Sequence, residues 1–141
     1  MHDDPVAAFL AALSAKDFDR LGRALAPDAV QELPYAPPGF PEAFVGRAAI
    51  VGHFRAGLAR REGLAFTVVS RHDVAGLSIV EFDGRSLIAE TGRVYAQRYV
   101  GYFFHDGVAI SRMREYFNPL RFVDAFDGIA NIRRIMAVEH A

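Results

Sequence analysis

The sequence contains no cysteine among its 141 residues. The absence of thiols excludes disulfide bridges, thiolate metal sites and cysteine nucleophiles. Its five histidines, at positions 2, 53, 72, 105 and 140, never recur at the close spacing of a helical histidine pair. We therefore expect no metal site built from the side chains of this protein.

The sequence also lacks an excess of charge of either sign. Lysine plus arginine number 16 and aspartate plus glutamate 17, so the formal charge is -1. Such a chain has no long-range field for holding nucleic acid or an anionic membrane. Residues 1–5 are acidic where a secretory signal would be basic, and no run approaches the ~20 apolar residues of a membrane span. A cytoplasmic protein is expected, with neither nucleic acid nor a membrane as its partner.

The N-terminal third of the sequence has the period of helices. Asp3 or Asp4 can cap a helix over 4–15, whose apolar residues recur three or four positions apart. Asp17 can cap a second helix, which Pro27 ends. The two helices are expected to form a short hairpin.

A short strand and a third helix are predicted next. Residues 29–35 favour an edge strand, because Pro34 cannot donate a hydrogen bond to a central ladder. A helix is predicted over about 46–62, with Phe54 on its apolar face. At about 100° per residue, His53 lies at the shoulder of that face, where a side chain can border a cavity.

The C-terminal half has the composition of strands. These are predicted over 64–73, 77–88, 93–105 and 108–117. A break or bulge is expected in the second strand, at Asp83 and Gly84. Helices followed by an antiparallel meander indicate an α+β fold. No linker or repeat divides the chain, so residues 1–141 are expected to form one domain.

The pairing of the last two strands predicts which face of the sheet each charged residue occupies. If Asp106 and Gly107 form a two-residue turn, counting outward sets Arg98 opposite Glu115. One face of this hairpin then carries Arg98, Val100, Tyr102, Phe104, Ser111, Met113, Glu115 and Phe117. The other face includes Tyr99, Arg112, Arg114 and Tyr116. Because arginine and tyrosine are enriched at interfaces, we expect this second face to pack on another subunit, in a homodimer, or on the C-terminal tail.

We assign a small-molecule pocket to the face with Glu115, because a carboxylate among aromatic and apolar side chains is typical of a ligand site. The predicted ligand-binding residues are Tyr102, Phe104, Met113, Phe117, Arg98, Phe54, Tyr35 and His72. A second interpretation stays open, in which Glu115 is a structural carboxylate paired with Arg98. His53 likewise fits either a proton shuttle or a partly exposed polar residue of a helix.

The order of these elements and two motifs resemble a known family. Two helices, a short strand, a third helix and a meander closed by Arg-Glu-Tyr-Phe-Asn-Pro at 114–119 are similar to the SnoaL-like branch of the nuclear-transport-factor-2-like superfamily. Val-Glu-Phe-Asp-Gly at 80–84 resembles the Val-Glu-Cys-Asp-Gly stretch of the phenazine-biosynthesis proteins PhzA and PhzB. The Arg-Glu-Tyr of the closing motif is similar to the Arg-Glu-Phe segment of their last strand.

The resemblance implies a cone-shaped domain, in which a curved antiparallel sheet wraps around three N-terminal helices and encloses a pocket. It also implies a dimer formed through the sheet. In the phenazine proteins the glutamate of the last strand and a histidine of the third helix act as acid and base, and Glu115 and His53 match these positions. Gly57 departs from the pattern, because a polar side chain is expected one turn after that histidine.

This fold hosts isomerases, cyclases, epoxide hydrolases and proteins with no chemistry. We predict an isomerase or cyclase that acts without a cofactor on a cyclic or polyketide-like metabolite, with Glu115 and His53 transferring protons. The alternative is a ligand-binding or dimeric accessory protein that turns nothing over. The catalytic prediction requires Glu115 and His53 to reach one cavity.

Overall fold

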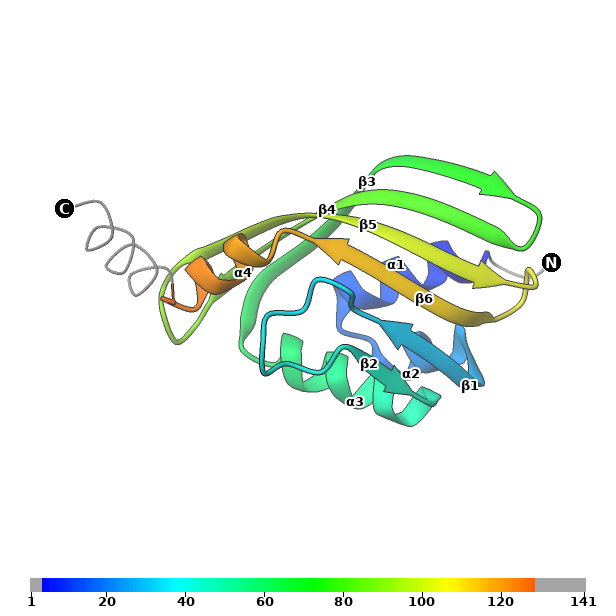
Figure 1. The fold of residues 1–141 in the computed structure, drawn as a ribbon, viewed down its shortest axis with the longest axis horizontal. Helices are drawn as coiled ribbons and strands as arrows, with labels where there is room; N and C mark the ends of the chain where they lie inside the picture. The colour runs from blue at the N-terminus through cyan, green and yellow to red at the C-terminus, as the bar shows by residue number, and fades with distance from the viewer. Residues whose placement is uncertain (1–3, 129–141) are drawn as a thin grey trace.

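The computed structural model describes residues 4–128, which form one curved sheet with helices on one side and at one end (Figure 1). The helices are α1 (Pro5–Ala15), α2 (Phe18–Arg23), α3 (Arg47–Leu58) and α4 (Pro119–Ala125). The strands are β1 (Leu25–Glu32), β2 (Ala43–Val45), β3 (Arg61–Val74), β4 (Leu77–Ile88), β5 (Val94–His105) and β6 (Ile110–Phe117). Within this range, no helix is both long enough and apolar enough to cross a membrane.

Helix α1 forms where the sequence predicts it, whereas the two helices that follow it are shorter than predicted. Helix α2 ends at Arg23, before Pro27, and α3 ends at Leu58, so that β3 begins at Arg61 within the range predicted as helix. Asp4 caps α1 by accepting a hydrogen bond from the backbone N–H of Val6 at 3.1 Å. Asp17 caps α2 in the same way, through the N–H of Arg20 at 3.0 Å. Asp3, the other predicted cap, lies outside the described residues.

The fourth helix, α4, was not predicted, although its start signal is present in the sequence. Asn118 caps it by accepting from the N–H of Leu120 at 3.0 Å, and Pro119 occupies its first turn. The buried side chain of Gln97 on β5 holds this junction. Its amide nitrogen donates to the Asn118 carbonyl at 2.7 Å, and its amide oxygen accepts from the Asn118 N–H at 3.1 Å. These two bonds fix the start of α4 against the inner face of the sheet.

The strands lie in the order β2-β1-β6-β5-β4-β3. The meander from β3 to β6 is antiparallel, as predicted, whereas β1 pairs in parallel with β6. The prediction of residues 29–35 as an edge strand is wrong, because β1 lies between β2 and β6. Pro34 does not interrupt the ladder, since β1 ends at Glu32.

Strand β4 runs through Asp83 and Gly84 without a break, so the predicted interruption is wrong. Gly84 instead allows neighbouring side chains to pack closely against the strand. A Cβ atom at Gly84 would lie 2.8 Å from the ring of Phe66 and 3.0 Å from the ring of Tyr99. The missing side chain therefore leaves room for two aromatic rings on the inner face of the sheet.

The β5–β6 connection differs from the predicted two-residue turn. The Asp106 carboxylate accepts hydrogen bonds from the N–H groups of Val108 and Ala109, both at 2.9 Å, which stabilises a longer loop. The ladder also shifts between Phe104 and His105. Both features change the register of the hairpin.

In the observed register Glu115 pairs with Gly101, and the predicted pairing with Arg98 is wrong. The observed register differs from the predicted one by three residues, which is an odd number. The side chains of β5 that were predicted to share the face of Glu115 therefore point to the opposite face. Arg98, Tyr102 and Phe104 therefore lie on the outer face of the sheet. The inner face of β5 carries Tyr95, Gln97, Tyr99 and Phe103, all of them buried.

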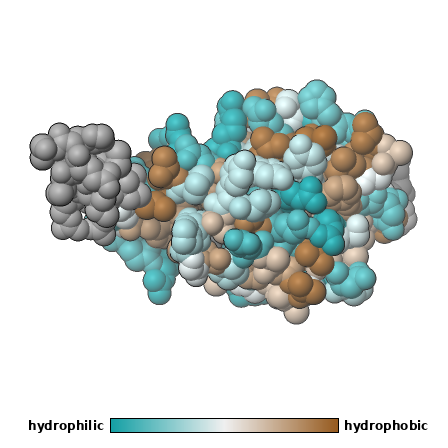
Figure 2. All heavy atoms as spheres, viewed as in Figure 1, coloured by the Kyte–Doolittle hydropathy of each residue, from teal (hydrophilic) through white to brown (hydrophobic). Residues whose placement is uncertain are grey.

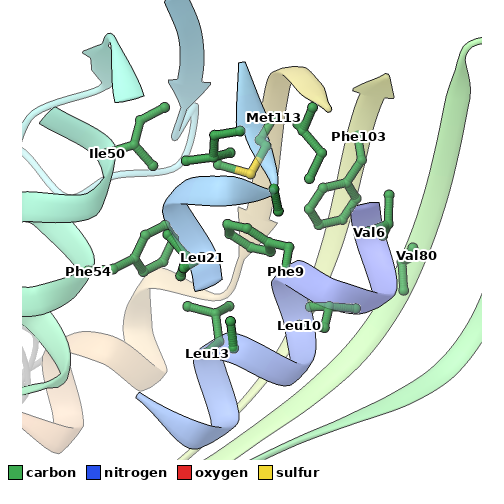
Figure 3. Close-up of a cluster of buried hydrophobic side chains, with 14 of the residues drawn as sticks. Val6, Phe9, Leu10, Leu13, Leu21, Ile50, Phe54, Val80, Phe103 and Met113 are labelled. Carbon is green, nitrogen blue, oxygen red and sulfur yellow. The ribbon is translucent and has the colours of Figure 1, made fainter. Parts of the chain in front are cut away.

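The hydrophobic core lies between the three N-terminal helices and the inner face of the sheet (Figure 3). Phe9 of α1 is at its centre, with ring centroids 5.6 Å from Phe54 of α3 and 5.8 Å from Phe103 of β5. Met113 of β6 is fully buried in the same cluster. Phe54 and Leu13 belong to this core and also line the cavity described below, so the core forms one wall of the site.

We predict that Gly84→Val lowers the free energy of unfolding by about 1–3 kcal/mol, because its side chain overlaps the rings of Phe66 and Tyr99. Gly52→Ala is the matched control. A Cβ there meets nothing within 4 Å, and alanine stabilises a helix by about 1 kcal/mol relative to glycine. Urea unfolding measures both changes. If Gly84→Val were as stable as the wild type, the packing role of this glycine would be refuted.

Candidate functional site

A cavity of about 870 Å³ lies between the inner face of the sheet, α3, α4 and the loop that follows β1. Its walls are mainly aromatic and include Phe44, Phe54, Phe66, Phe82, Phe117 and Phe122. The polar side chains of His53, Arg61, Tyr95, Tyr99 and Glu115 also line it. This volume and this mixture of many apolar and few polar groups suit a small organic molecule.

Glu115 of β6 is only 7% exposed. Its ladder partner, Gly101, has no side chain that could bind the carboxylate. Burial raises the pKa of Glu115 to about 7, and the positive charge of Arg61 acts in the opposite direction. The carboxyl group is therefore about half protonated at neutral pH and can donate or accept a proton.

Arg98 does not neutralise Glu115, because its guanidinium lies on the outer face of the sheet. There it donates to both carboxylate oxygens of Asp83, at 2.7 and 3.0 Å, and lies 3.3 Å from Glu81. The interpretation of Glu115 as the structural partner of Arg98 is therefore wrong.

His53 of α3 lines the same cavity as Glu115. Its ring stacks on Phe44 of β2, with centroids 4.2 Å apart, and lies 5.2 Å from the ring of Phe54. Burial lowers the pKa of His53 below its ordinary value, so the imidazole is neutral at neutral pH and can accept a proton. The two predicted acid/base residues thus meet at one cavity from different elements of the fold.

Tyr95 and Tyr99 of β5 were not predicted as site residues. Burial raises the pKa of Tyr95 and raises that of Tyr99 well above its ordinary value, so both stay protonated. The Tyr95 hydroxyl accepts a hydrogen bond from Gln97 at 3.1 Å. Two protonated phenols beside the cavity can donate hydrogen bonds to an oxygen of a ligand. Their alternation along the strand is visible in the sequence, but the face that they occupy depends on the register.

The remaining predicted ligand-binding residues divide between the cavity and other places. Phe54 and Phe117 line the cavity, whereas Met113 is buried in the core and does not border it. Tyr35 is 55% exposed, and its ring lies 5.1 Å from Tyr116 on the outer face. His72 is exposed on β3, outside the cavity lining.

The described residues offer little to a metal ion. Between positions 4 and 128, no three histidine, aspartate or glutamate side chains come together as a metal site requires. The donors that line the cavity are instead suited to hydrogen bonding and proton transfer.

Comparison with known proteins identifies the fold. A family model described as a SnoaL-like domain matches residues 6–113. An uncharacterized PhzA/B-like protein from Pseudomonas aeruginosa is 33% identical over 112 residues, which cover 78% of this chain and 79% of that protein. The crystal structure of a candidate isomerase from Bacillus subtilis is 31% identical with a TM-score of 0.81, covering 88% of this chain and 91% of that one.

A solved structure of lower sequence identity is described by its fold. It is a Catenulispora acidiphila protein with a ketosteroid isomerase-like fold, solved in complex with trimethylamine. It is 18% identical with a TM-score of 0.70, and the match covers 82% of this chain and 86% of that one. At this identity the likeness shows the fold alone, which confirms the predicted α+β cone.

We predict that Glu115→Gln changes how stability depends on pH. The pKa of this carboxyl rises from an ordinary 4.5 to about 7 on folding, so the folded protein holds the proton more tightly than the unfolded chain. The stability of the wild type therefore falls as pH rises through this interval. The variant should match the wild type near about pH 4 and exceed it by up to about 3 kcal/mol at about pH 8.

Urea unfolding across this pH range measures the difference between the two proteins. Glu62→Gln, at an exposed position of β3, is the control and should run parallel to the wild type. A Glu115→Gln curve that also runs parallel would show that the carboxyl has an ordinary pKa.

Proposed function

This chain belongs to the SnoaL-like family, and on that premise we propose that it is an isomerase or cyclase acting without a cofactor on a cyclic or polyketide-like metabolite. The proposal rests on one observation, which is that Glu115 and His53 line the same apolar cavity in complementary protonation states. Burial raises the pKa of Glu115 to about 7 and lowers that of His53, so a carboxyl group that holds a proton shares the cavity with a neutral imidazole. Such a pair can divide the roles of acid and base.

The proposed reaction moves a proton within the bound substrate. One of the two groups removes a proton from a carbon beside a carbonyl group, and the other returns a proton elsewhere on the same skeleton. Substrate and product then have the same composition. Tyr95 or Tyr99 donates a hydrogen bond to the carbonyl oxygen, where negative charge develops in the transition state.

A second candidate function is a ligand-binding or accessory protein that uses the same cavity. Gly57 favours it, because this residue lines the cavity without a side chain at the position where a polar group is expected one turn after His53. On this alternative the cavity binds its ligand and no proton is transferred.

We predict that Glu115→Gln and His53→Gln each lower turnover by about 10²–10⁴-fold, the contribution typical of a positioned acid or base. Cyclic β,γ-unsaturated ketones are suitable test substrates, because their isomerisation produces a conjugated enone with strong ultraviolet absorbance. Glu62→Gln makes the same chemical change at an exposed position and should keep full activity. Activity that survives in Glu115→Gln would remove this carboxyl from the mechanism, and inactivity of the wild type across such a panel would favour the binding function.

We also propose a homodimer formed through the outer face of the sheet. On this face the ring of Tyr116 lies 5.1 Å from Tyr35 and 6.0 Å from Tyr102, and Arg114 binds Glu32 at 3.2 Å. Figure 2 shows hydrophilic and hydrophobic patches side by side over the strands. Tyrosine and arginine are enriched in interfaces, whereas a face turned to water has a more uniformly polar surface.

We predict that Tyr116→Glu converts the dimer to a monomer, because it places a charge in the centre of the proposed contact. Analytical ultracentrifugation measures the change. Val108→Glu, at the exposed β5–β6 loop, is the control and should remain dimeric. A wild-type protein that sediments as a monomer at micromolar concentration would refute the interface.

A further inference from the structure

The buried side chain of Gln97 makes four hydrogen bonds on the inner face of β5. Its amide nitrogen donates to the Asn118 carbonyl at 2.7 Å and to the Tyr95 hydroxyl oxygen at 3.1 Å. Its amide oxygen accepts from the backbone N–H of Asn118 at 3.1 Å and from that of Arg98 at 3.2 Å. An amide has two donor hydrogens and two acceptor lone pairs, so these bonds use the full capacity of the side chain.

These partners allow the amide of Gln97 only one orientation. A backbone N–H can only donate and a carbonyl oxygen can only accept, so an inverted amide would set its NH₂ group against two donors. The N–H that faces Tyr95 is therefore fixed, and the Tyr95 oxygen is the acceptor in this contact. A phenol has a single proton, which must then point away from Gln97.

The neighbouring phenol of Tyr99 acts on Tyr95 in the same sense. Burial raises the pKa of Tyr95, and the hydrogen bonds of Gln97 and Tyr99 oppose this rise. A neighbour that lowers the pKa of a phenol does so by donating to its oxygen. Burial also raises the pKa of Tyr99, and Tyr95 raises it further. Of the two phenols, Tyr95 is therefore the one that receives hydrogen bonds, and its proton is directed at neither Gln97 nor Tyr99.

The ring of Tyr95 is held in the cavity wall together with its hydroxyl. The centre of the Arg61 guanidinium lies 4.9 Å from the ring centroid, and the ring of Phe122 on α4 meets it edge to face at 6.1 Å between centroids. Besides burial, the negative charge of Glu115 raises the pKa of Tyr95, so the hydroxyl lies near the carboxyl group that lines the same cavity. Ring and hydroxyl thus have fixed positions beside an acid/base group.

We propose that Gln97 is a positioning residue, which holds the Tyr95 hydroxyl so that its proton is donated to an oxygen of the bound ligand. The inference rests on the proposed function, in which Tyr95 or Tyr99 donates to a carbonyl oxygen, and it assigns that bond to Tyr95. A donor whose direction is fixed in advance needs no reorganisation when negative charge develops on the ligand. The amide of Gln97 also binds both backbone groups of Asn118, so one side chain sets the start of α4 and the direction of this hydroxyl.

The first test uses two uncharged probes of the same shape on the full-length wild-type protein. Methyl naphthalen-2-yl ketone has a carbonyl oxygen, which isopropenylnaphthalene, substituted at the same position, replaces by a methylene group. The infrared band of the bound ketone should lie at lower frequency than in an apolar solvent, because a donated hydrogen bond weakens the carbonyl double bond. An unshifted band, or no binding of the ketone at millimolar concentration, would overturn the proposal.

The second test assigns the donor. Tyr95→Phe should abolish the shift of the ketone band and lower the affinity for the ketone, relative to that for the alkene, by about 2–10-fold, the contribution of one neutral hydrogen bond. Tyr99→Phe removes the neighbouring hydroxyl and should keep both. A shift that survives in Tyr95→Phe would come from another donor, and the proposal would fall.

The third test concerns Gln97 itself. Gln97→Met keeps the length of the side chain but removes its hydrogen bonds, so the Tyr95 hydroxyl is free to turn and the ketone band should lose most of its shift. Gln31→Met is the matched control, because it makes the same change at a fully buried glutamine that does not line the cavity. If Gln97→Met bound the ketone with the wild-type band, the positioning role would be refuted.

A further measurement applies if thermal melting shows that Gln97→Met does not fold. In the wild type, ketone binding should polarise the Tyr95 hydroxyl, strengthen its bond with Gln97 and move the NMR signal of the Gln97 side-chain N–H downfield. The alkene should leave this signal in place. Equal signals in the two complexes would contradict the proposal.

These experiments measure binding without turnover, so the two proposals fail separately. A ketone band that does not depend on Gln97 removes the positioning role alone. An inactive wild type whose ketone complex shows the Gln97-dependent shift removes the acid/base function alone.

Discussion

Glu115 pairs across the sheet with Gly101, and this pairing leaves its carboxyl group buried with no cation beside it in the ladder. Had the strands met three residues earlier, Arg98 would have bound the carboxylate and held its pKa low. Instead Arg98 binds Asp83 on the other face. The same register places Tyr95 and Tyr99 on the inner face, so a single feature of the hairpin decides both the acidity of Glu115 and the donors that surround it.

Burial acts on the polar groups of the cavity in one consistent sense, which is to favour their neutral forms. It raises the pKa of Glu115 and Tyr99 and lowers that of His53. Arg61 is the exception, because a guanidinium stays charged under all ordinary conditions. Its Nε donates to Ser86 at 2.9 Å, whereas its Nη2 is buried without a hydrogen-bond partner among residues 4–128.

Local signals in the sequence account for much of the architecture. The caps at Asp4 and Asp17 and the period of the apolar residues depend on neighbours within a few positions, and the starts of α1 and α2 were predicted correctly. The faces of β6 were also correct from Arg112 to Phe117, because alternation along one strand needs no partner. At its start the ladder shift buries Ile110 and leaves Ser111 exposed, so the predicted face of Ser111 is wrong. The α4 helix was not predicted, although Asn118 and Pro119 are typical residues for the start of a helix. A helix this short is stabilised mainly by tertiary contacts, here the hydrogen bonds of the Gln97 side chain.

By itself, then, the sequence determined the class of fold and the family, because these follow from local patterns and from motifs read along the chain. It also predicted Glu115 and His53 as site residues, and both line the cavity. Only the tertiary structure decided which side of β5 faces the cavity, since the loop at Asp106 and the shift beside His105 set the register through contacts that no local pattern specifies. It also decided that Arg61, which is remote in sequence from Glu115, lies in the same cavity. Side chains from separate strands and helices meet only after the sheet has curved, and for that reason the chemistry of the cavity is a property of the folded chain.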